Sequence, residues 1–137
     1  MCRLNAKEVI IMTGGKNISI SDAEFEIIRV LWSADEPMTA QDISEREEMK
    51  KWKYSTIATL LKRMYEKGAV TYEKRGRYFY YSPLIDEREY KAEQTKTLVS
   101  RLYNGSVKNL VAALFENKQL DGSDIKEIKD MFDLWED

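Results

Sequence analysis

One stretch, from Trp52 to Tyr81, places the pattern of an amphipathic helix directly before that of a β-hairpin, and it constrains the fold of this 137-residue chain most strongly. Its first half has apolar residues at helical spacing and ends before Gly68, a residue type that commonly terminates helices. These apolar positions are Ile57, Leu60, Leu61, Met64 and Tyr65. Two runs rich in valine, threonine and aromatic residues follow at 70–74 and 77–82, joined by a short turn around Arg75 and Gly76. The stretch predicts a helix followed by a two-stranded wing.

The opposite face of this predicted helix is polar. Short hydroxyls and long cations on a rigid helix suit contacts with phosphates and base edges in a major groove. The residues of this face are Ser55, Thr59, Lys62 and Glu66, with Thr56 and Arg63 at its edge. Most surface helices also expose polar residues, so the helix taken alone favours a solvated face.

Charge is distributed unevenly along the chain. The net charge is −2, but residues 49–77 carry nine Lys or Arg against two Glu, a net charge of +7. Residues 84–137 carry eight cations and twelve acids, a net charge of −4. Because the basic stretch coincides with the predicted helix and wing, it favours a nucleic acid as the partner over a merely lysine-rich surface.

Two further helices are predicted before the polar-faced one. Ser21 and Glu24 have the spacing of a capping box for a helix to about Ser33, and Thr39 caps a second helix from Ala40 to about Glu48. Residues 19–83 are therefore expected to form a winged helix-turn-helix domain. Residues 1–18 show no clear period and are predicted to be a flexible arm without an assigned function, and Met12 is an equal candidate for the translation start.

The remaining residues, 84–137, are predicted to form three helices, so the fold class is mainly α. A core of about this size rarely stabilises itself without a disulfide, a metal or a partner. We therefore expect this region to dimerise, with packing back onto the first domain as the alternative. The expected interface residues are Leu98, Leu102, Val107, Leu110, Val111, Leu114, Phe115, Ile125, Ile128 and Phe132.

Composition argues against an enzyme. The chain has no histidine and a single cysteine, so metal sites, catalytic triads and internal disulfides are not expected, and no cofactor is predicted. A lysine base beside Ser55, Ser82 or Ser106 is the one nucleophilic arrangement that composition leaves open. No apolar run is long enough to cross a bilayer, and we expect a cytoplasmic protein without membrane insertion.

Several motifs together resemble the penicillinase-repressor family of winged-helix transcriptional regulators, over about residues 18–135. They are ISDAEFEIIRVLW from Ile20, the run W-x-x-x-TI-x-TLL-x-R from Trp52, KGAV from Lys67, GRYFYYSP from Gly76, and LYNGS from Leu102. The resemblance implies a homodimeric repressor on a palindromic operator in double-stranded DNA. In that arrangement the third helix enters the major groove, the wing lies on the backbone and the C-terminal helices form the dimer.

The family's base-contacting positions fall on the third predicted helix. Close relatives place lysine or a long polar side chain where this chain has Ser55 and Ala58, so the operator sequence is expected to differ, and Lys53 and Tyr54 replace a frequent Ser-Pro helix start. The expected base-contacting residues are Ser55, Thr56, Ala58, Thr59 and Arg63. The residues expected to contact the DNA backbone are Lys50, Lys51, Lys53, Lys62, Lys74, Arg75 and Arg77.

Two modes of regulation within the family can be compared with this chain. In the antibiotic-responsive branch, a membrane sensor protease or its downstream protease leads to a cut between Asn and Phe, and the aligned pair here is Ala113 and Leu114. In the copper-responsive branch, C-terminal cysteines bind the metal, and this chain has no cysteine beyond Cys2. The inducing signal stays open, with cleavage near Ala113 as one candidate and antibiotic-resistance regulation as one context. The alternative function is a winged-helix module that binds an acidic protein.

Overall fold

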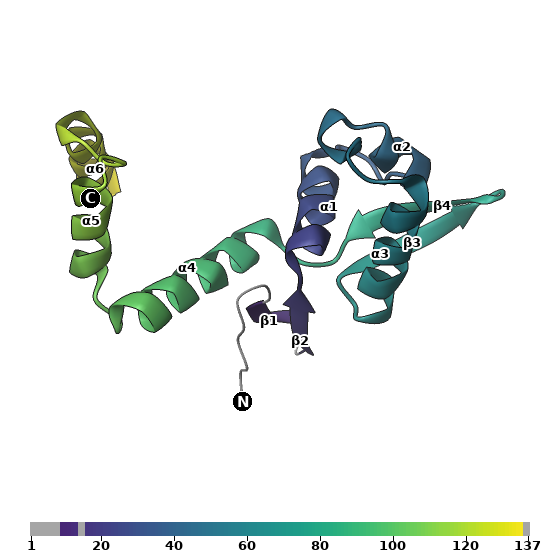
Figure 1. Cartoon of the computed structure of the whole chain (residues 1–137), viewed down its shortest axis with the longest axis horizontal. Coiled ribbons are helices and arrows are strands. Elements are labelled where there is room, and N and C mark those ends of the chain that lie inside the picture. The colour runs from purple at the N-terminus through teal and green to yellow at the C-terminus, as the bar shows by residue number, and fades with distance from the viewer. Residues whose placement is uncertain (1–8, 14–15, 136–137) are drawn as a thin grey trace. The chain divides into compact units, whose positions relative to one another are not determined.

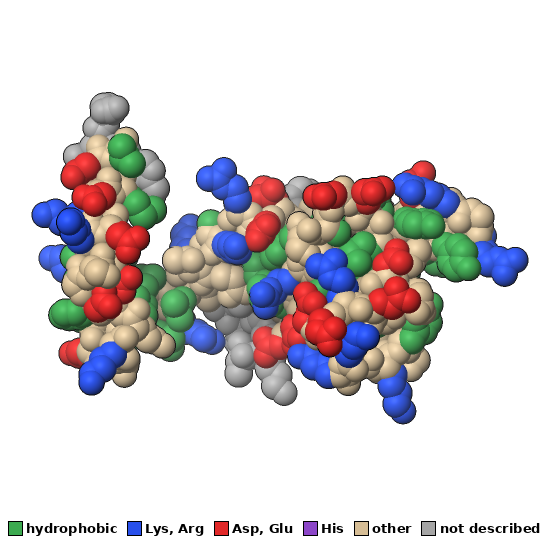
Figure 2. All heavy atoms as spheres, turned by 90° about the horizontal axis from the view of Figure 1, so that it is seen from above, with side chains coloured by type: hydrophobic (Ala, Val, Ile, Leu, Met, Phe, Trp, Pro, Cys, Tyr) green, Lys and Arg blue, Asp and Glu red, His purple; other side chains and the backbone are tan. Residues whose placement is uncertain are grey.

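The computed structural model describes residues 9–13 and 16–135, which form two compact units, one up to Glu93 and the other from Gln94 (Figure 1). On the face that Figure 2 shows, basic and acidic side chains are interspersed. The helices and strands are β1 (Val9–Thr13), β2 (Lys16–Ile20), α1 (Asp22–Ser33), α2 (Ala40–Ser44), the 3₁₀ turn η1 (Glu47–Met49), α3 (Tyr54–Glu66), β3 (Val70–Arg75), β4 (Tyr78–Pro83), α4 (Glu87–Tyr103), α5 (Val107–Glu116) and α6 (Gly122–Trp135).

Helices α1 and α2 both begin with the predicted caps. The Ser21 hydroxyl accepts a hydrogen bond from the Glu24 backbone amide at 3.2 Å, and the Glu24 carboxylate accepts one from the Ser21 amide at 3.0 Å. Thr39 and Asp42 form the same reciprocal pair. These caps satisfy amides that the first helical turn leaves without partners, which fixes where each helix starts.

The second helix is shorter than predicted. It ends at Ser44 rather than near Glu48, because Arg46 has an extended backbone with φ −70° and ψ 143°. A separate 3₁₀ turn follows and directs Met49 into the core, where its side chain is fully buried. Compared with the predicted helix, α2 is thus about one turn shorter, and the 3₁₀ turn adds the Met49 side chain to the core ahead of α3.

Helix α3 begins and ends close to the predicted residues. It starts at Tyr54, and its N-cap, Lys53, makes no side-chain capping bond. At its end, Gly68 has φ +85°, and the amides of Gly68 and Ala69 donate to the carbonyls of Tyr65 and Met64. This pair of bonds is a Schellman motif, which requires the left-handed backbone that glycine adopts without strain.

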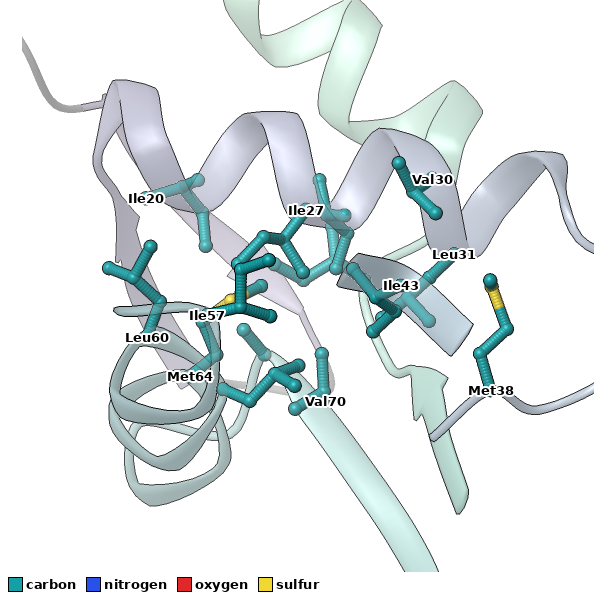
Figure 3. Packing of buried hydrophobic residues seen from close by; sticks show 14 of the residues in the cluster. Ile20, Ile27, Val30, Leu31, Met38, Ile43, Ile57, Leu60, Met64 and Val70 are labelled. Carbon is teal, nitrogen blue, oxygen red and sulfur yellow. The ribbon is translucent and has the colours of Figure 1, made fainter. Parts of the chain in front are cut away.

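The core of the first unit lies between α1, α2, α3 and β3 (Figure 3). Four of the five predicted apolar residues of α3 are buried there: Ile57, Leu60, Leu61 and Met64. Tyr65 differs from the prediction, because 46% of it is exposed and its ring contacts Tyr72 of the hairpin instead of the core. The buried face of α3 therefore ends one residue earlier than its apolar pattern.

The predicted wing is the antiparallel hairpin formed by β3 and β4. Arg75 pairs with Tyr78, so Gly76 and Arg77 form a two-residue turn, and Gly76 has φ +65°. A positive φ at the first turn residue only is the signature of a type II′ hairpin turn. At the other end, Met38 exchanges two backbone hydrogen bonds with Tyr81 and extends the sheet by a short bridge.

A second hairpin, formed by β1 and β2, lies where no regular structure was predicted. Residues 9–13 pair with residues 16–20 in antiparallel register, so all but the last two residues of this hairpin lie in the predicted flexible arm of residues 1–18. Ile18 and Ile20 are both buried in the core of the first unit. The core therefore begins before the predicted domain start at residue 19, while residues 1–8 and 14–15 lie outside the described residues.

The segment before α4 and the first turn of α4 pack on α1. The indole nitrogen of Trp32 donates to the carbonyl oxygen of Ile85 at 2.9 Å, and Tyr90 stacks on Phe25 with a ring separation of 5.3 Å. Tyr90 is buried as a result. Because of these contacts, the first compact unit extends to Glu93, ten residues beyond the predicted boundary at Pro83.

The three helices predicted after the wing are α4, α5 and α6, and the second unit contains α5, α6 and the part of α4 from Gln94 onward. Ser106 caps α5 by accepting from the Asn109 amide. Asp121 caps α6, and its pKa is lowered by the hydrogen bonds that it accepts from the backbone amide of Asp124 and from Ser123. Within the described residues, no helix has the length and apolarity needed to cross a bilayer.

Candidate nucleic-acid interface

The outward face of α3 carries the predicted base-contacting side chains. Ser55, Thr56, Thr59 and Arg63 are exposed, and Ala58 is half-buried at the edge of the same face. Lys62 is exposed beside them. Since Ile57, Leu60, Leu61 and Met64 anchor the opposite face in the core, these side chains stand on a rigid helix.

The Thr59 hydroxyl already has one partner, because it donates to the carbonyl oxygen of Ser55 at 2.9 Å. A hydroxyl has a single hydrogen, so in this geometry Thr59 offers outward only its oxygen lone pair and its methyl group. Those groups match the amino group of adenine or cytosine and the methyl group of thymine. Thr59 is thus equipped to accept a hydrogen bond or to make an apolar contact.

The predicted backbone-contacting cations fall into two sets. Lys51 pairs with Glu26 at 2.6 Å, and Arg75 pairs with Glu73 at 3.0 Å while it covers the Tyr80 ring at 4.6 Å. The other five are exposed and have no ion pair among the described residues: Lys50, Lys53, Lys62, Lys74 and Arg77. A phosphate would have to compete with a carboxylate at the first two positions but not at these five.

One lysine of the basic stretch is turned away from the outward face. The Lys67 ammonium donates to the Glu24 carboxylate at 2.8 Å and to the Ser19 carbonyl oxygen at 2.6 Å. Glu24 is 0% exposed, and Lys67 is only partly exposed. Lys67 therefore joins β2, α1 and α3, and it does not belong to the basic surface that the charge count indicated.

The wing adds basic and aromatic side chains beyond α3. Lys74, Arg75 and Arg77 lie at or next to its turn, and Figure 2 shows blue and green side chains together at the right-hand end, where the wing lies. Tyr81 is partly buried at the base of the wing. Burial raises the pKa of Tyr81, and the nearby Tyr72 and Tyr54 raise it further.

The apolar residues predicted for dimerisation lie on α4, α5 and α6. Leu110 and Leu114 are half-buried within the chain. The other eight are exposed: Leu98, Leu102, Val107, Val111, Phe115, Ile125, Ile128 and Phe132. A single copy of the chain thus leaves most of this predicted surface in contact with solvent.

The pair predicted to align with the family's cleavage site lies inside α5. Ala113 and Leu114 are half-buried, and the Ala113 carbonyl oxygen accepts hydrogen bonds from the amide of Asn117 at 3.1 Å and from its side chain at 2.8 Å. A protease binds its substrate in an extended form, so cleavage here would require this part of α5 to unwind.

No metal-binding arrangement occurs in the described part of the chain, since no three His, Cys, Asp or Glu side chains gather there closely enough to hold an ion. The polar groups of α3 and the wing are hydroxyls, ammonium groups and guanidinium groups. Such groups bind anions and base edges by hydrogen bonds and charge.

One family model and several known proteins are similar to this chain. The chain matches the family model described as Penicillinase repressor over residues 20–133. It is similar to the penicillinase repressor of Bacillus licheniformis, with 38% identity over 109 residues, 80% of this chain and 85% of that protein. It is also similar to the methicillin resistance regulatory protein MecI of Staphylococcus aureus strain N315, with 29% identity over 116 residues, 85% of this chain and 94% of that protein. Among solved structures, the solution structure of the DNA binding domain of the repressor BlaI shares 39% sequence identity with a TM-score of 0.46, covering 52% of this chain and 87% of that chain.

Proposed function

Because the chain belongs to the penicillinase repressor family of DNA-binding transcriptional repressors, we propose that it represses transcription as a homodimer on a palindromic operator. The observation that carries this proposal is the division of α3 into two faces. One face is buried in the core, and the other exposes Ser55, Thr56, Thr59 and Arg63. This is the arrangement that a helix needs to enter the major groove of DNA.

Base contacts come from the outward face of α3. Arg63 can donate two hydrogen bonds to a guanine edge, while Thr56 and Thr59 contact neighbouring bases. Ser55 and Ala58 are shorter than the side chains that relatives place there, so they reach fewer base atoms directly. The operator of this chain therefore differs in sequence from those of its relatives at the bases that face these two residues.

Contacts with the DNA backbone come from the cations around α3 and on the wing. Lys50 and Lys53 precede α3, Lys62 lies on it, and Lys74 and Arg77 lie on the wing. Lys51 and Arg75 contribute less, because each already pairs with a carboxylate of the chain. Each phosphate that is neutralised releases counterions, which makes this part of the affinity dependent on salt.

The C-terminal helices join two copies. Their apolar residues are exposed in the single chain, and a second copy would bury them. Two copies related by a twofold axis place two α3 helices on successive major grooves, so the operator has matching half-sites. The chain acts in the cytoplasm, where the DNA is.

The inducing signal acts on this dimer. Proteolysis between Ala113 and Leu114, started by a membrane sensor protease, would divide α5 and separate the two copies. The hydrogen bonds on the Ala113 carbonyl oxygen hold this segment helical, so cleavage there depends on local unwinding of α5. A mass spectrum of the fragments from induced cells identifies the bond that is cut.

Two substitutions separate base contacts from backbone contacts. Arg63→Ala is expected to cost about 1–3 kcal/mol on the preferred operator and to reduce the discrimination between operators that differ at one base pair. Arg77→Ala is expected to weaken binding to all sequences alike and to lower the slope of log K against log salt by about 0.9. Fluorescence-anisotropy titrations at several salt concentrations, on operator and unrelated duplexes, measure both effects.

Lys126→Ala is a matched control, because it removes an exposed cation from α6, which carries none of the proposed DNA contacts. It should leave the salt slope unchanged. If Arg63→Ala keeps full discrimination between operators, α3 does not supply the sequence preference. If no duplex is bound by the folded dimer at low salt, the winged helix has an acidic protein as its partner instead.

A further inference from the structure

Four aromatic rings form a continuous row between α3 and the wing. Tyr65 of α3 contacts Tyr72 of β3 with a centroid separation of 4.7 Å. Tyr72 in turn contacts Phe79 at 4.6 Å and Tyr81 at 5.6 Å, both on β4. These four residues are called the aromatic row below.

The register of the wing explains why the rings meet. Tyr72 pairs with Tyr81, and Lys74 pairs with Phe79, so these side chains lie on one face of the hairpin. The contact between Tyr72 and Tyr65 shows that this is the face turned toward α3. The opposite face carries Glu73, Arg75, Tyr78 and Tyr80.

The aromatic row is only partly buried. Tyr65 is 46% exposed and Phe79 is 42% exposed, although neither has a charged group that would require solvent. Residues that served only to stiffen the wing could be buried as fully as Met64, which precedes Tyr65 on the same helix and is 0% exposed. The row thus presents apolar area to whatever approaches between α3 and the wing.

Cations flank the aromatic row, which indicates an anionic partner. The Lys74 ammonium lies 6.0 Å from the centre of the Phe79 ring, and exposed Lys62 lies three residues before Tyr65 on α3. Two carboxylates are near in sequence. Glu73 lies on the opposite face of the hairpin and pairs with Arg75, whereas Glu66 follows Tyr65 on α3. A partner that is both apolar and anionic fits this combination.

We propose that Tyr65, Tyr72 and Phe79 form a largely uncharged contact surface for the DNA strand that passes between α3 and the wing, packing against its deoxyribose groups. This inference rests on the proposed function, because it requires α3 in the major groove and the wing beyond the adjoining strand. Deoxyribose offers apolar C–H edges to the rings, and the phenols of Tyr65 and Tyr72 can donate to the neighbouring phosphates.

The contribution of the aromatic row to DNA affinity should depend neither on salt nor on base sequence. Packing of rings against sugars neutralises no phosphate, so it releases no counterions and does not change with salt. It is also insensitive to base sequence, since every nucleotide has the same sugar. The aromatic row thus adds affinity that persists at salt concentrations at which the contacts of Lys74 and Arg77 have weakened.

Phe79→Ala tests this surface. On both operator and unrelated duplexes, it should weaken binding by about tenfold at every salt concentration, with the slope of log K against log salt unchanged. Tyr78→Ala is the matched control, because Tyr78 is 54% exposed on the same strand but lies on the opposite face, and it should change the affinity less than about twofold.

Phe79→Lys provides a second test of apolar packing, in case Phe79→Ala destabilises the hairpin of β3 and β4. A purely electrostatic surface would bind more tightly with the added cation, whereas apolar packing predicts weaker binding at high salt. Hydrogen exchange of the β3 and β4 amides verifies that the wing stays folded.

Unchanged affinity in Phe79→Ala, an equal loss in Tyr78→Ala, or tighter binding by Phe79→Lys at high salt would overturn the proposal. Equal affinity of the unsubstituted chain for operator and unrelated duplexes would contradict only the sequence-specific function, because a loss in Phe79→Ala on both duplexes would still support the aromatic contact. Failure to bind any duplex would overturn both.

Discussion

Lys67→Met is expected to lower the free energy of unfolding of the first unit by about 3 kcal/mol, because it leaves the Glu24 carboxylate buried without its counterion. Glu24 is completely buried, and one of its two oxygens, Oε2, has no hydrogen-bond partner among the residues that the structure describes. The other oxygen would keep only the Ser21 amide. Hydrogen exchange of the α1 and α3 amides reports this unit alone, and it should accelerate by roughly 150-fold.

Two further variants separate charge from packing. Lys62→Met removes an exposed lysine of the same helix and should change the free energy of unfolding by less than about 0.5 kcal/mol. Glu24→Gln combined with Lys67→Met should recover most of the loss, because glutamine retains the capping bond without a buried charge. If the double variant is as unstable as Lys67→Met, the buried charge of Glu24 is not the cause, and the lost hydrogen bond from Lys67 to the Ser19 carbonyl oxygen is what matters.

Val111→Asp combined with Phe115→Asp is expected to convert the proposed dimer into monomers and to weaken operator binding by about 100-fold or more, since each half-site must then be bound independently. Both residues are exposed in the single chain and lie one helical turn apart on α5. The carboxylates therefore stay in solvent in the monomer but would be buried in the dimer, where burial of an unpaired charge is costly. Sedimentation equilibrium measures the mass, and anisotropy titration measures the affinity.

Asn109→Asp combined with Ala112→Asp is the control, because it adds the same two charges to other exposed positions of α5. This variant should remain dimeric and should bind the operator within a few-fold of the unsubstituted chain. If both variants are monomeric, the added charge has a general effect on α5. If both variants remain dimeric, the interface lies elsewhere.

Local signals in the sequence predicted the framework of the fold. Ser21 with Glu24, and Thr39 with Asp42, cap their helices through contacts within three residues of the chain. Gly68 and Gly76 end α3 and turn the wing because both positions have positive φ. Such features depend on neighbours along the chain, and a sequence displays them directly.

Features that depend on distant residues were not predictable. The Glu24–Lys67 pair joins residues 43 positions apart, and nothing in the basic stretch distinguished Lys67 from the exposed lysines. Tyr65 fitted the apolar pattern of α3, but its neighbour is Tyr72 on the wing, which only the folded hairpin brings close. The β1–β2 hairpin likewise shows its importance only through the burial of Ile18 and Ile20 in a core built from later residues.

For the candidate site, the sequence indicated which residues lie on the outward face of α3 but not which cations are available. Lys51 and Arg75 could be assigned to phosphates on residue type alone, whereas the structure gives each a carboxylate partner. The base-contacting and dimerisation residues remain predictions, since each depends on a partner molecule.

Hydroxyl-radical footprinting on the DNA upstream of the chain's own gene tests the central claim most directly, because repressors of this type commonly regulate their own operon. We predict two protected half-sites related by twofold symmetry, on one face of the duplex and about 10 bp apart or a multiple of that distance. Protection should disappear from both half-sites together in the Val111→Asp, Phe115→Asp variant. A folded, dimeric chain that protects no DNA, or that protects one unsymmetrical patch, would contradict a dimeric repressor that places two α3 helices on a palindromic operator.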